Sequence, residues 1–212
     1  MGVDTSPSER WDVVVPVKAA RIGKSRLGGS PELARAIAAD SLDAVLRASL
    51  VARVILVTAD RQLPRMLVVG ADRGARLVVV AESGGSGISA AVLAGLAVSA
   101  RERPRAVLLG DVPALEPLEL DAALVLAGHA RRAFVPDADG EGTVLVTAAS
   151  GVRLREAFGA GSAAAHRALG LVELAVGAET GLRRDVDTRE QLAEVIARAP
   201  ASRTARAASQ LA

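Results

Sequence analysis

The chain has 212 residues, half of which are hydrophobic, and its 26 basic and 24 acidic side chains nearly balance. This length is enough for one domain with a sizeable core. There is no cysteine, which excludes disulfides, thiol catalysis and zinc sites built on cysteine. The three aromatic residues are too few to form the stacking platform that single-stranded nucleic acid requires.

The isoelectric point of about 9.9 is no evidence for nucleic-acid binding. It follows from a net charge of only +2 in a chain without Cys or Tyr and with two His, where few groups titrate between about pH 7 and 10. No stretch approaches the roughly 18 apolar residues of a membrane span, and the N-terminus lacks a signal-peptide pattern. We therefore expect a cytoplasmic protein that binds neither nucleic acid nor a membrane.

The first half of the chain alternates between strand and helix patterns. Residues 1–10 are expected to be a disordered lead, and residues 11–199 to form the folded domain. Ser30 as N-cap and Pro31 at the first helical position mark the start of the first helix. The elements expected up to residue 110 are a strand at 12–17, a helix at 31–50, a strand at 53–58, a helix interrupted by Pro64, a strand at 76–81, a helix at 88–102 and a strand at 106–110.

The second half continues the alternation, with one hairpin-like pair of strands around an acidic turn at 137–142. The expected elements are a helix at 117–129, strands at 133–136 and 143–148, a short helix at 163–169, a strand at 172–176, a helix at 189–199 and a flexible tail at 200–212. Such alternation implies βαβ units. We predict a single-domain, Rossmann-like α/β fold with a mostly parallel mixed sheet and helices on both faces.

Lys18 and Lys24 are the only lysines, and the other 24 basic residues are arginine. Both follow the first predicted strand, in a segment that also contains Arg26. Lysine is a compact point charge, whereas arginine is a planar fork. A loop that requires point charges most often binds a phosphate chain. The alternative is a solvated run of charge.

Three aspartates stand where ligands bind in open α/β sheets, at the carboxyl ends of strands. Asp111 ends the strand at 106–110, although it could equally be a turn or cap residue. Asp185 and Asp187 lie two residues apart, so an extended backbone projects both to one side. Converging carboxylates favour a bound cation, and Mg²⁺ suits them. A capping box formed by Thr188 and Gln191 is the alternative, but it leaves Asp185 unexplained.

A glycine-rich loop before the helix at 88–102 offers another interpretation. The run from Gly85 to Ala90 matches the G-x-G-x-x-A dinucleotide fingerprint, and the acidic Asp111 follows about 20 residues later. However, the match lies in the third βα unit, and NAD binding would leave the two lysines and the Asp pair without a function. Dinucleotide binding is therefore the weaker alternative.

Five segments, in this order, resemble the guanylyltransferases of coenzyme F-420 biosynthesis: VPVKAARIGKSRL, LLGDVPAL, GEGTVLV, FGAGSAAAH and RRDVDT. That family acts on 2-phospholactate or phosphoenolpyruvate and is related to the molybdenum-cofactor nucleotidyltransferases. The resemblance runs from about Val13 to Gln191. It implies a single nucleotidyltransferase domain, Mg²⁺ as cofactor, and GTP and a three-carbon phosphate as substrates.

The resemblance also implies roles for individual residues. Lys18, Lys24, Arg26 and Asp111 would be catalytic. The GTP triphosphate would be bound by Lys18, Lys24 and Arg26, the nucleotide also by Gly85, Gly87 and Ser89, the Mg²⁺ by Asp111, Asp185 and Asp187, and the three-carbon phosphate by Thr143, Gly159 and Ser162. Relatives tend to carry Asn where this chain has Ser89, so its recognition of guanine departs from the family pattern.

The expected reaction is transfer of GMP from GTP to phosphoenolpyruvate with release of pyrophosphate. A phosphate monoester is already ionised at pH 7, since its second pKa is near 6, so no general base is needed. This agrees with a chain that has almost no histidine; His166 is expected either to contact the substrate or to be a solvated helical residue. The alternatives are 2-phospholactate or 3-phosphoglycerate as acceptor, a molybdopterin-type guanylyltransferase, and a non-catalytic nucleotide-binding module.

Overall fold

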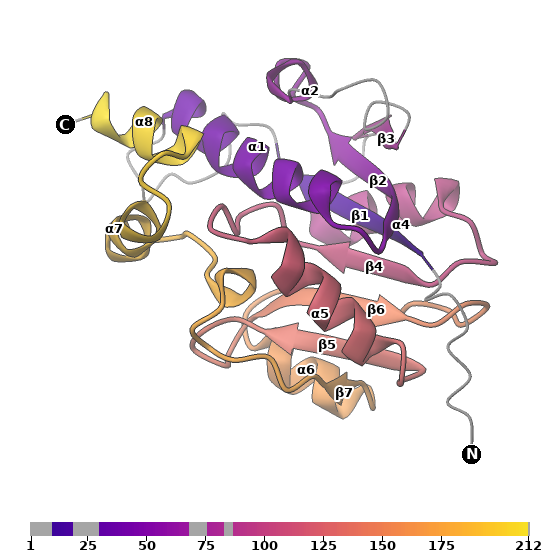
Figure 1. Cartoon of the computed structure of the whole chain (residues 1–212). Helices are drawn as coiled ribbons and strands as arrows, with labels where there is room; N and C mark the ends of the chain where they lie inside the picture. Colours follow the sequence, from indigo (N-terminus) through magenta and orange to yellow (C-terminus); the bar gives the residue numbers. More distant parts are fainter. Residues whose placement is uncertain (1–9, 19–29, 68–75, 83–86, 212) are drawn as a thin grey trace.

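The computed structural model describes residues 10–18, 30–67, 76–82 and 87–211, and within these one sheet of seven strands forms the centre, in the order β3-β2-β1-β4-β6-β5-β7 (Figure 1). Only β6 runs antiparallel to its neighbours β4 and β5, and the other pairings are parallel. The strands are β1 (Trp11–Val17), β2 (Val51–Thr58), β3 (Leu77–Ala81), β4 (Arg105–Leu108), β5 (Arg132–Pro136), β6 (Thr143–Ala148) and β7 (Val172–Glu173). The predicted mostly parallel mixed sheet is confirmed.

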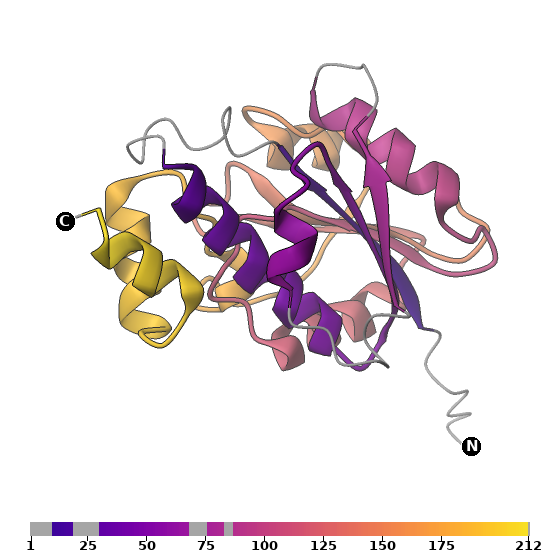
Figure 2. The ribbon, with the colours of Figure 1, turned by 90° about the horizontal axis from the view of Figure 1, so that it is seen from above.

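Helices cover both faces of this sheet, as predicted. α1 (Pro31–Arg47) and α5 (Pro117–Ala127) pack on one face, and α4 (Ile88–Val98) and α6 (Ser162–Ala168) on the other (Figure 2). The central strand β1 shows why its sequence is an unbroken apolar run. Val13 and Val15 enter the core under α1, whereas Val14 enters the core under α4. Because both faces of this strand are buried, its sequence does not alternate between apolar and polar residues.

Gly95 allows α4 to lie directly against the central strand. A Cβ at this position would overlap the Val14 side chain of β1. Glycine in a helix interior costs about 1 kcal/mol relative to alanine, so its presence here is explained by the close approach.

Two helices end earlier than their sequence pattern predicts, because carboxylates far along the chain capture the following N–H groups. α1 ends at Arg47, and Asp121 of α5 accepts the N–H groups of Ser49 at 2.9 Å and Leu50 at 2.8 Å. α4 ends at Val98, since Asp12 of β1 accepts the Ala100 N–H at 2.8 Å. The expected ends were residues 50 and 102. Local spacing carries no information about partners so distant.

The short elements also differ in length from the prediction. α2 (Leu63–Met66) is a single turn with Pro64 near its start, where a proline is tolerated. β7 has two residues and pairs only with β5, so the strand expected at 172–176 is shorter. The predicted N-cap at Ser30 is confirmed: its hydroxyl accepts the Leu33 N–H at 3.2 Å.

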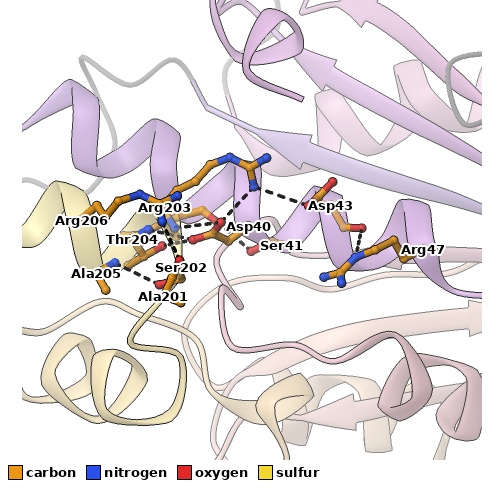
Figure 3. A network of polar contacts seen from close by, with 11 residues as sticks. Asp40, Ser41, Asp43, Arg47, Ala201, Ser202, Arg203, Thr204, Ala205 and Arg206 are labelled. Atoms are coloured by element: carbon orange, nitrogen blue, oxygen red, sulfur yellow. Dashed lines mark hydrogen bonds and ion pairs between the residues drawn. The ribbon is translucent and has the colours of Figure 1, made fainter. Parts of the chain in front are cut away.

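The flexible tail predicted at 200–212 is wrong for most of its length. After α7 (Arg189–Arg198), residues Arg203–Ser209 form α8, which packs along α1 (Figure 3). Asp40 of α1 accepts both the N–H and the hydroxyl of Thr204 at 2.8 Å, and Arg203 pairs with the same carboxylate at 3.1 Å. Thr204 is fully buried. A carboxylate from another helix therefore caps α8.

The contact between α1 and the C-terminal helices has a core of its own. Leu33 and Ile37 of α1 pack there with Val186 and with Val195 of α7. The segment between η2 (Gly181–Arg183) and α7 is thereby fixed against α1. Among the described helices, none combines the length and apolar character needed to cross a bilayer.

Candidate active site

A cavity of about 830 Å³ opens at the carboxyl ends of β1 and β4. β1 and β4 are neighbours in the sheet: the strands that follow β1 are added on one side of it, and β4 and the later strands lie on the other. Ligands of open α/β sheets bind at such a switch point, at the carboxyl ends of the strands. The first turns of α1 and the loops before α6 and α7 complete the lining. Of the twelve residues predicted to form the site, seven line this cavity: Lys18, Asp111, Thr143, Gly159, Ser162, Asp185 and Asp187.

One side, which we call the carboxylate wall, consists of Asp111, Asp185 and Asp187. The N–H of Val186 donates to the carbonyl of Asp111 at 3.0 Å, so the two segments lie side by side. Val186 is fully buried in the core beside α1, and the aspartates that flank it both line the cavity. The spacing of two residues therefore projects both carboxylates to one side, as the sequence predicts.

The carboxylate wall depends on a close approach at Gly181. A Cβ there would overlap the carbonyl oxygen of Ala114, in the loop that follows Asp111. The N–H of Gly181 donates to Glu119 of α5 at 2.9 Å. The chain leaving η2 can therefore pass directly beneath the loop after β4.

The capping box predicted as the alternative for this segment is also present. Thr188 Oγ1 accepts the Gln191 N–H at 3.2 Å, and Gln191 Oε1 accepts the N–H groups of Thr188 at 2.9 Å and Asp187 at 2.7 Å. The two interpretations are compatible, since capping orders the backbone while the Asp185 and Asp187 carboxylates line the cavity.

The described lining is strongly acidic. Lys18, which is exposed, is its single cation. The acidic residues are Asp111, Asp137, Asp139, Glu141, Asp185 and Asp187. A nucleoside triphosphate would be repelled from such a surface unless cations neutralised it.

The three aspartates are suitable in kind for a magnesium site. Mg²⁺ prefers oxygen ligands, and it uses one or two carboxylates together with substrate phosphate oxygens instead of a complete protein cage. Among the described residues, no three His, Cys, Asp or Glu side chains already stand close enough to bind a metal ion. Asp111, Asp185 and Asp187 each make a polar or charged contact within the protein. In the chemistry of its oxygen donors, this set fits Mg²⁺ that also takes ligands from a bound phosphate.

The opposite side, which we call the acceptor wall, consists of Thr143 and residues 159–162. Thr143 and Ser162 are only 3% and 2% exposed, yet both line the cavity. Gly159 and Gly161 have positive φ angles of 144° and 67°, which side chains with a Cβ rarely adopt. Within the described chain, the N–H groups of residues 159–161 and the Ser162 hydroxyl make no hydrogen bond. These groups are free to donate to an anion.

The start of α6 contributes a side chain to the cavity. Ser162 is the first residue of α6, and Gly161 is its N-cap. The N–H of Ser162 donates to the carbonyl of Gly159 at 3.2 Å, and that of Ala163 to the carbonyl of Glu141 at 3.0 Å. The start of α6 therefore offers its hydroxyl to the cavity, whereas these two helix N–H groups are already used.

His166 takes neither of its two expected positions. It is fully buried, does not line the cavity and bonds to Thr143, with 2.9 Å between Nδ1 and Oγ1. Burial lowers the pKa of His166 below its ordinary value of 6.5. No local sequence pattern indicates this contact, because Thr143 lies 23 residues away on strand β6.

The structure describes only some of the residues that were predicted to bind the nucleotide. Lys24, Arg26 and Gly85 lie outside the described residues. Gly87, with a φ of 110°, is the N-cap of α4, and Ser89 is exposed in its first turn. Neither of these two residues lines the cavity, whereas Ile88 between them does.

Other lining residues were missed by sequence reasoning. Asp137, Asp139 and Glu141 come from the turn between β5 and β6, which was predicted only as an acidic turn. The Asp137 carboxylate accepts the N–H groups of Glu141 at 3.0 Å and Gly142 at 2.7 Å, so it orders the approach to Thr143. The sequence feature that could have indicated these lining residues is the cluster of acidic residues at the start of the GEGTVLV segment.

Comparison with known proteins identifies the family. A phosphoenolpyruvate guanylyltransferase from Streptomyces coelicolor is 44% identical over 211 residues, which cover 95% of this chain and 97% of that protein. A second, from Thermomonospora curvata, is 39% identical over 221 residues and covers 100% of this chain and 95% of its own length. The chain belongs to the phosphoenolpyruvate guanylyltransferase family. No family model matches the sequence.

Solved structures agree with the fold of this phosphoenolpyruvate guanylyltransferase family member. A nucleotidyl transferase from Methanothermobacter matches with a TM-score of 0.57 at 16% identity, over 88% of this chain and 95% of the other. A 4-diphosphocytidyl-2C-methyl-D-erythritol synthase from Anaerococcus prevotii matches with a TM-score of 0.58 at 10% identity, over 90% and 95%. These likenesses concern the fold, and they confirm the predicted nucleotidyltransferase architecture.

Proposed function

We propose that this member of the phosphoenolpyruvate guanylyltransferase family transfers GMP from GTP to phosphoenolpyruvate and releases pyrophosphate. The product would be enolpyruvoyl-2-diphospho-5'-guanosine, a precursor of coenzyme F-420. The observation that carries the proposal is one cavity with two unlike walls, in a chain 44% identical to a protein of that name. Both substrates are cytoplasmic metabolites, so we expect the reaction to take place there.

The acceptor wall supports a small anionic acceptor. The hydroxyls of Thr143 and Ser162 and the free N–H groups of residues 159–161 are donors without charge. Such donors suit phosphate and carboxylate oxygens, which accept strong hydrogen bonds. In phosphoenolpyruvate both anionic groups are carried on a three-carbon unit that small donors can surround.

The carboxylate wall supports the nucleotide half of the reaction. Asp111, Asp185 and Asp187 would hold Mg²⁺, which when bound would neutralise phosphate charge and polarise the α-phosphoryl group. Lys18 would bind the triphosphate from the end of β1, and Lys24 and Arg26 would join it from the following segment. Their charges would offset the repulsion between GTP and an anionic acceptor.

The chemistry then needs no proton transfer at the nucleophile. A phosphate oxygen of phosphoenolpyruvate, ionised at pH 7, forms a bond to the α-phosphorus of GTP. The bond from that phosphorus to the oxygen bridging the α- and β-phosphates breaks, and the electron pair leaves with pyrophosphate. The protein contributes by placing the two anions and by stabilising the charge that develops between them.

The test is pyrophosphate release by the purified chain with GTP and Mg²⁺ and one acceptor at a time. We expect turnover with phosphoenolpyruvate that exceeds turnover with 2-phospholactate and 3-phosphoglycerate, and none when ATP or CTP replaces GTP. Chelation of the divalent cation should stop the reaction. Turnover with another acceptor alone would reassign the substrate, and GTP binding without pyrophosphate release would indicate a nucleotide-binding module.

A further inference from the structure

His166 of α6 is buried directly behind the acceptor wall. Its ring packs against Phe134 of β5 and against Phe158, each with a centroid 5.5 Å away. Both ring nitrogens are hydrogen-bonded: Nδ1 lies 2.9 Å from Thr143 Oγ1, and Nε2 accepts the Ala157 N–H at 2.9 Å. One ring therefore joins β6 to the loop that precedes α6.

The bond from Ala157 fixes the position of the ring's hydrogen. Because an N–H donates to Nε2, that nitrogen carries no hydrogen, so the ring is neutral with its hydrogen on Nδ1. Burial lowers the pKa of His166, against the opposing influence of the Glu156 carboxylate and the Ser162 backbone, and so favours the neutral ring. It follows that Nδ1–H donates to Thr143.

This bond determines what the Thr143 hydroxyl can offer. Its oxygen already accepts a hydrogen bond from His166, so its own hydrogen is left to donate. Within the described residues this hydrogen has no other partner, and Thr143 lines the cavity. A free hydroxyl can rotate to serve as donor or acceptor, but this one is set as a donor toward the cavity.

The second bond of the ring acts on the rest of the acceptor wall. Ala157 begins the loop that continues through residues 159–161, whose N–H groups are unused. Anchoring the Ala157 N–H on Nε2 fixes where this loop starts.

We propose that His166 is the positioning residue of the acceptor subsite: its neutral ring orients the Thr143 hydroxyl as a hydrogen-bond donor and anchors the loop at 157–161. His166 does not touch the substrate and transfers no proton. The inference rests on the proposed function in that the ligand it prepares for is the phosphate or carboxylate of the three-carbon acceptor. A purely structural histidine would make the same packing contacts without affecting acceptor binding selectively.

Nitrogen-15 NMR of the two histidine rings tests the arrangement without any turnover. At pH 7 we expect His166 to carry its hydrogen on Nδ1 and to have a bare Nε2. His129, exposed after α5, supplies the reference ring in the same spectrum. A His166 ring with its hydrogen on Nε2, or with both nitrogens protonated, would overturn the proposal whichever acceptor the enzyme uses.

Two substitutions separate the two bonds of the ring. In His166→Asn the amide lies near the position of Nδ1 and can still donate to Thr143, but the bond from Ala157 is lost. KM for phosphoenolpyruvate should therefore rise only about threefold, through the loop at 157–161 alone. In His166→Gln the amide lies near the position of Nε2, and the bond to Thr143 is lost. This KM should then rise about tenfold, the value of one hydrogen bond, with KM for GTP unchanged. His129→Gln is the matched control.

A double-mutant cycle with Thr143→Val decides whether His166 acts through Thr143. In that background, His166→Gln should raise KM for phosphoenolpyruvate by less than about twofold further, because the hydroxyl it orients is gone. Fully additive effects, or equal changes in KM for GTP, would overturn the positioning role. If wild type turns over only another acceptor, the proposed function fails, and the same cycle with that acceptor still tests His166.

Discussion

The carboxylate wall and the acceptor wall of the cavity are preorganised to different degrees. On the carboxylate wall, a main-chain hydrogen bond from Val186 holds the segment of Asp185 and Asp187 beside Asp111, and the proposed function places a cation at these carboxylates. The Thr143 hydroxyl is already oriented by a buried neutral ring. Under the proposed function, the carboxylate wall binds an anion through a cation, whereas the acceptor wall binds one directly. Substitutions on the two walls should have separable effects.

The largest effect is expected on the carboxylate wall. Asp185→Asn or Asp187→Asn should lower kcat by about 10³ while the fold remains intact, because each removes a ligand charge without adding bulk. Turnover and circular dichroism of each variant measure the two outcomes. Glu190→Gln, which removes the same charge in the first turn of α7, is the control. Variants within about threefold of wild type would contradict a metal-binding role for these aspartates.

Substitution of the lysines tests whether the protein itself, in addition to a metal ion, supplies positive charge that binds the GTP triphosphate. Lys18→Ala and Lys24→Ala should each weaken GTP binding or slow transfer by about 10². Lys18→Arg should recover only part of the loss, since a planar fork cannot replace a point charge. Steady-state kinetics with varied GTP measure the effect, with Arg61→Ala as an exposed control. Unchanged kinetics in both alanine variants would make the lysine pair a coincidence.

On the acceptor wall the effect should be smaller and selective. Thr143→Val and Ser162→Ala should each raise KM for phosphoenolpyruvate about tenfold, the value of one lost hydrogen bond, and leave KM for GTP nearly unchanged. Thr147→Val makes the same chemical change on the same strand, where the hydroxyl donates to the Ala133 carbonyl at 3.3 Å instead of lining the cavity. A lower melting temperature with unaltered acceptor kinetics would remove these residues from the acceptor subsite.

Asp40→Asn tests how strongly the carboxylate wall depends on the packing of the C-terminal helices. Asp40→Asn weakens the cap of α8 and should lower the free energy of unfolding by about 1–2 kcal/mol. Because α8 and Val186 share one small core with α1, any kinetic loss should appear on the GTP side. Chemical denaturation is the measurement. Asp43→Asn, whose contact with Arg203 is a single ion pair at 3.5 Å, should cost less.

The smallest effect should appear in the pH dependence of stability. Burial depresses the pKa of His166 below 6.5, so the unfolded chain takes up a proton there before the folded chain does. The contribution of the buried neutral His166 to the free energy of unfolding is fully present above about pH 6.5. It is lost as the pH falls through the pKa of His166 in the folded state. Melting curves between pH 7 and 5 should therefore decline less steeply for His166→Gln than for wild type. Parallel declines would contradict the neutral buried ring.

The order of elements could be predicted from the sequence because buried strands are uninterrupted apolar runs. Val13, Val14 and Val15 face two different cores, so the run has no polar gap. The carboxylate wall was predictable for a similar reason: alternation along an extended chain is local, and it places Asp185 and Asp187 on one side.

What could not be predicted depends on partners distant in the chain. The segment RTARAAS has no large apolar face, and its helix forms because Asp40, more than 160 residues earlier, caps it. In the same way, neither Thr143 nor His166 indicates in its local sequence that the other lies 2.9 Å away. Hydrogen bonds of this kind follow from the packing of the sheet, which local patterns do not specify.

The main-chain bond between Val186 and Asp111 holds the carboxylate wall together whatever side chains stand at positions 111, 185 and 187. Every residue type except proline can donate that N–H, and the carbonyl partner is common to all residues. If these residues bind the proposed cation, mutation at positions 111, 185 and 187 should change ion preference or activity while this main-chain bond is kept. A library randomised at only these three codons should remain largely folded, and it would be a suitable starting point for selecting new metal or acceptor specificities.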